Sequence, residues 1–129
     1  MNTLIDAVKK SALGPAQIKD ADTIAGRYCF TDDFIGFSGH FPGYPILPAV
    51  VQMMAALCLI EEQKGHQLQL NSVQNAKFLQ EIRPGNELLI QCTDYPVKGM
   101  PGSKIQIYSG DKIAASFLMT FYDKGEQSC

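Results

Sequence analysis

The chain has 129 residues, a length that fits one domain with room for a hydrophobic core. Its net charge is −2, from 11 basic and 13 acidic residues without a block of like charge, which argues against a nucleic-acid partner and against a polybasic membrane-binding surface. The four cysteines show no metal-ligand spacing and fit a reducing, cytoplasmic compartment. The sequence has no P-loop and no Rossmann fingerprint, so we expect no metal ion and no cofactor held by the chain itself.

The first predicted elements are a short amphipathic helix, a strand and a long loop. Residues 1–14 carry apolar side chains at helical spacing, end in a Gly-Pro pair that stops a helix, and lack the long apolar run of a secretory signal. Residues 23–31 are rich in β-branched and aromatic residues and predict a strand. Residues 32–45 form a loop that is long for a plain connector, and such loops are often functional.

A buried helix is predicted over residues 48–64. Pro48 suits the first turn of a helix, where its missing N–H costs nothing, and Gly65 suits the end. The first dozen residues are apolar on almost every face, so we expect the helix to be enclosed on all sides. The apolar part is shorter than the roughly 20 residues of a membrane span, so none is expected.

Antiparallel strands are predicted after the helix. They cover residues 68–79, 86–96 and 103–123, the last stretch being divided by a turn at Ser109–Gly110–Asp111. The polar residues 123–129 are expected to form a loose tail. A sheet wrapped around one central helix satisfies this order of elements, so we expect a single α+β domain over residues 1–129.

The loop before the helix carries His40 in the stretch GHFPGYPILP. A helix N-terminus presents unpaired N–H groups, here those of Ala49, Val50 and Val51, and a partial positive charge, so a carbonyl aimed at that end would be polarised as in an oxyanion hole. A thioester polarised in this way has an acidic α-proton, which a nearby histidine can remove at neutral pH. A plainer interpretation is that His40 only hydrogen-bonds its own loop.

This stretch resembles the G-H-F-P-x-x-P signature of the β-hydroxyacyl-ACP dehydratases, which have the hot-dog fold. Residues 75–90, NAKFLQEIRPGNELLI, are similar to the strand, R-P-G-D turn and strand of that family, and residues 110–121 are similar to its last strand. The likeness therefore extends over most of the chain.

The resemblance implies a dimer with a continuous sheet, in which the phosphopantetheine arm of an acyl carrier protein or CoA enters a tunnel between two chains. The residue matching His40 takes the α-proton of the 3-hydroxyacyl thioester, and the N–H of Ala49 binds the thioester oxygen. Residues of the loop and helix would bind the substrate: Phe37, Phe41, Gly43, Pro48, Val50, Gln52, Met53 and Cys58. For the two phenylalanines, Met53 and Cys58, the alternative interpretation is packing in the core.

The sequence departs from the family where the catalytic acid belongs. The Glu or Asp that protonates the leaving hydroxyl, supplied by the central helix of the other protomer, falls on Met54 here. A shift of one residue gives Met53 or Ala55, and no carboxylate lies between Asp33 and Glu61. Glu61 is about 10 Å farther along the helix axis. Loss of a general acid costs roughly 10²- to 10⁴-fold in rate.

Three interpretations follow. The first is a hydro-lyase whose acid is water, an unexpected residue or a partner subunit. The second is a hot-dog thioesterase, although those enzymes also need an acid near the central helix. The third is a non-catalytic subunit or acyl-thioester binder, which would form a heterodimer with an acid-bearing paralogue rather than a homodimer or higher homo-oligomer.

Two polar residues keep two interpretations each. Gln52 is the one polar side chain early in the helix, and it either faces the pocket and donates a hydrogen bond or belongs to the helix packing. Arg83 either forms the R-P-G turn or meets the acidic surface of a carrier protein.

Overall fold

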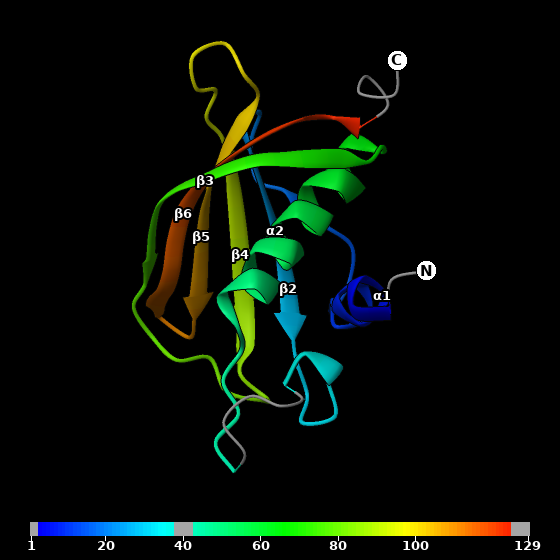
Figure 1. Cartoon of the computed structure of the whole chain (residues 1–129), viewed down its shortest axis with the longest axis vertical. Coiled ribbons are helices and arrows are strands. Elements are labelled where there is room, and N and C mark those ends of the chain that lie inside the picture. The colour runs from blue at the N-terminus through cyan, green and yellow to red at the C-terminus, as the bar shows by residue number, and fades with distance from the viewer. Residues whose placement is uncertain (1–2, 38–42, 125–129) are drawn as a thin grey trace.

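The structure, a computed structural model, describes residues 3–37 and 43–124. The described elements are α1 (Thr3–Lys10), β1 (Gln17–Ile18), β2 (Thr23–Cys29), the short 3₁₀ helix η1 (Ile35–Phe37), α2 (Ala49–Lys64), β3 (Leu68–Phe78), β4 (Glu87–Asp94), β5 (Gly102–Ser109) and β6 (Lys112–Asp123). The strands form one curved sheet, and α2 lies across it (Figure 1). The predicted α+β architecture, a sheet wrapped around one long helix, is confirmed.

The sheet is antiparallel throughout, with the strand order β1-β2-β4-β5-β6-β3. The chain leaves β2 near one edge, passes through α2 and re-enters at the opposite edge as β3, which pairs with β6. One edge strand, β1, has two residues, whereas the other, β3, has 11. The connection across the sheet is what carries α2 over its concave face.

The ends of α2 follow from its terminal residues. Pro48 has φ −64° and ψ 150°, an extended conformation, so it precedes the helix and Ala49 is the first helical residue. Gly65 has φ 80°, and its N–H donates to the carbonyl of Glu61. A left-handed conformation of this kind favours glycine and ends a helix. The predicted stop at Gly65 is confirmed.

One side of α2 packs closely against the sheet. Ala55 and Leu59 are buried, and they belong to the same core as Ile107 and Phe117 of the sheet. Gly26 of β2 permits this approach, because a Cβ atom at that position would lie 2.7 Å from Cδ1 of Leu59. The small size of Gly26 therefore sets the spacing between the helix and the sheet.

The other side of α2 is not enclosed by the described residues, whereas the prediction was for a helix enclosed on all sides. Val50 is 59% exposed, and Met53, Met54 and Leu57 are only half-buried. These four residues recur at helical spacing and form the open stripe of α2. An apolar sequence cannot reveal whether its cover comes from the same chain or from another, and here the sheet covers one side alone.

Three boundaries differ from the prediction or refine it. Helix α1 ends at Lys10, because the N–H of Leu13 donates to the carbonyl of Arg27 at 2.8 Å and draws the chain alongside β2. Asp123 pairs with Leu68, so β6 includes the first residue of the expected tail, whose residues 125–129 lie outside the described part of the chain. The predicted turn at Ser109–Gly110–Asp111 is present, with φ 65° at its glycine.

Candidate functional site

The N-terminus of α2 presents free backbone donors. The N–H groups of Val51 and Gln52 approach the carbonyl of Pro48 at 3.1 and 3.2 Å. The N–H groups of Ala49 and Val50 have no acceptor within residues 3–37 and 43–124. Unpaired donors at a helix start can polarise a carbonyl. This arrangement is what the predicted role of Ala49 requires, and the role itself stays a prediction.

The loop that bears the predicted base lies partly outside the described residues. His40 and Phe41 fall within residues 38–42, so their roles stay predictions. Before the gap, Phe37 is buried, and its ring meets that of Phe34 edge-on at 5.6 Å between centroids. After it, Gly43 is exposed and has φ 81°, a conformation suited to glycine. The loop thus leaves from a buried aromatic cluster and returns through a left-handed glycine.

The chain entering α2 is held by the connection between β3 and β4. The Nε of Arg83 donates to the carbonyl of Pro45 at 3.0 Å, and its guanidinium lies 3.8 Å from the centre of the Tyr44 ring. The Tyr44 hydroxyl donates to Oε1 of Glu81 at 2.6 Å, a hydrogen bond that raises the pKa of Tyr44. Arg83 therefore orders this entry segment. No spacing rule connects Tyr44 with Glu81, so sequence reasoning missed the group.

Gln52 is buried at 5% exposure beside the helix start. Its Nε2 donates to the carbonyl of Leu47 at 3.2 Å, and its Oε1 has no hydrogen-bond partner in the described chain. A carbonyl can only accept, so the amide must turn its NH₂ group toward Leu47. The Gln52 NH₂ group, which was expected to donate a hydrogen bond into a pocket, donates to Leu47 instead. The group left without a partner is the carbonyl oxygen Oε1, which can only accept.

The position predicted for the catalytic acid holds Met54, a half-buried methionine on the open stripe. Met54 and its neighbour Met53 offer no proton there. The nearest carboxylates of α2 bind backbone donors instead. Oε2 of Glu61 accepts from the N–H of Leu68, and Oε2 of Glu62 accepts from the N–H of Ala16, both at 2.9 Å. Neither carboxylate is available at the helix start.

Cys58 does not gather with the helix start. It lines a cavity of about 410 Å³ between α1 and the C-terminal half of α2, together with Lys9 and Tyr28. It lies nine positions after Ala49, about 14 Å along the helix axis. Burial, with a smaller contribution from Glu61, raises the pKa of the Cys58 thiol to about 11. At neutral pH it is a protonated thiol and not a nucleophile.

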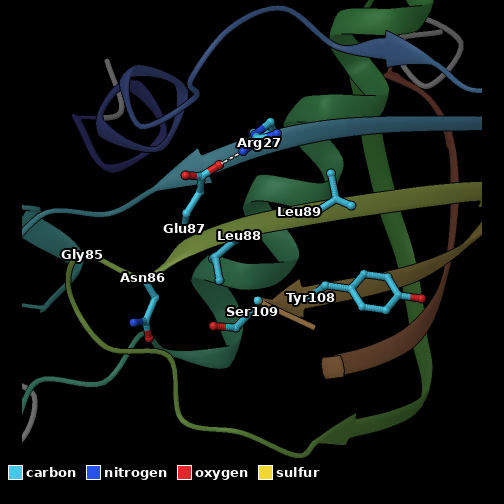
Figure 2. Close-up of a pocket in the computed structure, with 9 residues that line it drawn as sticks. Arg27, Gly85, Asn86, Glu87, Leu88, Leu89, Tyr108 and Ser109 are labelled. Carbon is cyan, nitrogen blue, oxygen red and sulfur yellow. Dashed lines mark hydrogen bonds and ion pairs between the residues drawn. The ribbon is translucent and has the colours of Figure 1, made fainter. Parts of the chain in front are cut away.

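A second hollow, of about 660 Å³, lies on the outer face of the sheet (Figure 2). Arg27, Leu89 and Tyr108 are neighbours in register and point outward, while the adjacent Tyr28, Leu88 and Ile107 are buried. An exposed ion pair joins Arg27 to Glu87. The strands separate this hollow from α2, so it is not part of the site at the helix start.

Within the described ranges, no group of three or more metal-ligating side chains comes together. No described helix is long and apolar enough to cross a membrane.

Comparison with known sequences gives a consistent result. A family model described as ApeI-like, ApeI dehydratase, matches residues 16–116. The 3-hydroxyacyl-(acyl-carrier-protein) dehydratase FabZ of Natranaerobius thermophilus is 34% identical, over 64% of this chain and 64% of that protein. FabZ of Halalkalibacterium halodurans is 31% identical, over 68% of each chain. The likeness thus covers about two thirds of these relatives.

Solved structures show the same fold. The dehydratase heterocomplex ApeI:P from Xenorhabdus doucetiae contains a chain with a TM-score of 0.70 and 19% identity, covering 85% of this chain and 95% of that one. The PaaI protein of E. coli matches with a TM-score of 0.65 and 16% identity, over 92% of this chain and 88% of that one. The predicted hot-dog fold is confirmed.

Proposed function

The chain belongs to the ApeI-like dehydratase family, and we propose that it takes part in the dehydration of 3-hydroxyacyl thioesters carried by an acyl carrier protein or CoA. In this reaction the α C–H bond and the C3–O bond break, a C2–C3 double bond forms, and the hydroxyl leaves as water after gaining a proton. The substrate brings its own phosphopantetheine arm, so the chemistry needs no resident cofactor.

His40 is the proposed base and the helix start is the proposed oxyanion site. The N–H of Ala49 would hold the thioester oxygen and stabilise the charge that develops as His40 removes the α-proton. The open N–H groups at the start of α2 support this role. Ala49 has a methyl group where the family commonly has glycine. The methyl group narrows the path by which the thioester oxygen reaches the backbone N–H, but the N–H itself is still present.

The half-buried Met54 on the open stripe is the observation that carries the rest of the proposal. In a homodimer, each site would receive Met54 from the partner and lack an acid. We infer that the acid comes from a different hot-dog chain that covers the open stripe. The exposed apolar stripe and the long edge of β3 support pairing. A similar fold occurs in a dehydratase heterocomplex of Xenorhabdus doucetiae.

The test is hydration of a 2-enoyl thioester, the reverse reaction, by the purified chain. Three variants accompany the wild type: His40→Ala, Met54→Glu and, as a matched control on the same open stripe, Met53→Glu. We expect slow hydration by the wild type, a rise of roughly 10²-fold in Met54→Glu and no rise in Met53→Glu, because only the former restores a general acid at the family's position. His40→Ala combined with Met54→Glu should abolish the gain.

Several outcomes would contradict the proposal. Wild-type hydration as fast as that of Met54→Glu would show that no acid is missing. Hydrolysis of the thioester without hydration would indicate a thioesterase. Absence of hydration by every variant, and by mixtures of the chain with acid-bearing hot-dog dehydratases, would leave only a binding role.

A further inference from the structure

The buried amide of Gln52 has one unused hydrogen-bonding group. We propose that Gln52 is a positioning residue whose Oε1 accepts a hydrogen bond from the 3-hydroxyl group of the bound 3-hydroxyacyl thioester, an inference that rests on the proposed function. The side chain is 5% exposed, and its Oε1 has no partner in the described chain. Buried carbonyl oxygens nearly always have a donor, and none of the described residues supplies one to Oε1.

The direction of this amide is fixed by its surroundings. Its Nε2 donates to the carbonyl of Leu47, and Leu47 is itself buried and bound through its N–H to the carbonyl of Ile82 at 2.8 Å. Rotation of the amide by 180° would place two carbonyl oxygens against each other. Oε1 is therefore held in place before any ligand binds, which favours recognition of a donor.

The amide lies at the level where the thioester oxygen is proposed to bind. Side chains of a helix lean toward its N-terminus, and the contact with Leu47 shows that Gln52 does so. Its amide thus sits beside Leu47, two residues before Ala49, whose N–H is proposed to hold the thioester oxygen. A ligand whose carbonyl meets that N–H would bring its neighbouring atoms to Oε1.

Among the donors of such a ligand, the 3-hydroxyl group fits best. It lies two carbons from the thioester carbonyl on the acyl side, which enters the apolar interior. The nearest pantetheine amide lies on the other side of the sulfur atom, behind two methylene groups, toward the carrier. Gln52 is buried whereas Ala49 is half-buried, so Oε1 is on the interior side of the oxyanion site.

A hydrogen bond of this kind orients the leaving group without transferring a proton. The hydroxyl donates its hydrogen to Oε1, and its oxygen keeps a lone pair for the proton that the missing acid must supply. An amide has no proton to give at neutral pH, so Gln52 does not replace that acid. It would fix the C3–O bond for elimination.

The test compares binding of three unreactive pantetheine amides, whose acyl groups carry a 3-hydroxyl, a 3-fluoro or no 3-substituent. Fluorine is close in size to a hydroxyl group but has no hydrogen to donate. We expect the wild type to prefer the 3-hydroxyacyl amide over the 3-fluoroacyl amide by roughly tenfold. In Gln52→Met, which is similar in volume and has no strong acceptor, this preference should vanish while binding of the unsubstituted amide persists.

Equal binding of the hydroxy and fluoro compounds by the wild type would overturn the inference, whatever the variant does. A preference that survives in Gln52→Met would overturn it too, because Oε1 would then hold only a water molecule. If Gln52→Met fails to fold, the wild-type comparison still decides. Failure of all three amides to bind would instead contradict the proposed function, so the two failures are distinguishable.

Discussion

Glu61 and Glu62 are acidic residues of α2 whose carboxylates serve the fold and not the site at the helix start. Each carboxylate accepts a hydrogen bond from a backbone N–H, that of Leu68 or that of Ala16. These bonds fasten the C-terminal half of the helix to the segments that flank it. The only acids of α2 are therefore structural, and its N-terminal half is left apolar around Gln52.

Replacing Glu61 should weaken the fold and leave the site at the helix start unchanged. Glu61→Ala removes a charged acceptor and leaves the N–H of Leu68 without a protein partner, so we expect a loss of about 1.5 kcal/mol in the free energy of unfolding. Gln63→Ala, an exposed neighbour, serves as control and should change stability by less than about 0.5 kcal/mol. Urea unfolding measures both, and equal effects would contradict the role of Glu61.

Buried cysteine thiols and a buried tyrosine hydroxyl should lower the free energy of unfolding at alkaline pH. Burial raises the pKa of the Cys58 thiol from 9.0 to about 11, and it raises the pKa of Tyr28 and Cys92 as well. Above the unfolded pKa the unfolded chain releases protons that the folded chain keeps, so stability falls with pH. The contribution of Cys58 should be complete below pH 9.0 and lost as pH rises toward about 11.

Thermal unfolding between pH 8 and pH 11 tests this expectation. Cys58→Ala should show a shallower decline than the wild type, because one of the titrating groups is gone. Identical pH profiles for the two proteins would show that Cys58 ionises with an ordinary pKa.

Gly26 and Leu59 join two elements, β2 and α2, at close range. A methyl group added at Gly26 would meet the Leu59 side chain, which is fully buried and has little room to move. We expect Gly26→Ala to destabilise the protein by about 1–3 kcal/mol through overpacking. In the double variant with Leu59→Ala the two losses should be less than additive, because the smaller side chain makes room. Strict additivity in denaturant unfolding would contradict this contact.

The elements that could be predicted are those with a local signature. Gly65 and Gly110 mark a helix end and a turn because both positions need a left-handed backbone. The two-residue β1 and the three-residue η1 were missed, since segments this short carry no periodic pattern. The position of β3 at the far edge depends on pairing with β6, which no local pattern specifies.

Those features of the candidate site that depend only on the local sequence could likewise be predicted. The predicted start of the helix at Pro48 lies one residue before the observed start at Ala49, and the absence of a carboxylate at position 54 is read directly from the sequence. The distance of Cys58 from that start follows from helix geometry, but the cavity that it shares with α1 depends on packing. The open acceptor of Gln52 could not be foreseen, because it depends on where the carbonyl of Leu47 lies.

At the scale of the whole molecule, the open stripe of α2 should control association. Leu57 is half-buried on that stripe. Leu57→Lys would place a charge in an apolar contact, so we expect it to shift the protein from a dimer, or from a mixed complex with a second hot-dog chain, toward the monomer. Gln63→Lys, on an exposed side of the same helix, is the matched control. Analytical ultracentrifugation decides, and an unchanged mass for Leu57→Lys would place the interface elsewhere.

The unequal edges of the sheet limit how far such an assembly can grow. At one side β1 offers only two residues for pairing, whereas at the other β3 offers 11. A chain that can pair with a neighbour at only one sheet edge cannot form an extended head-to-tail assembly. Two sheets joined through their β3 strands would have only the short β1 strand at each outer edge. Chains joined through β3 would therefore form a closed pair rather than a filament, and a pair is the smallest assembly in which the proposed second chain could supply the acid.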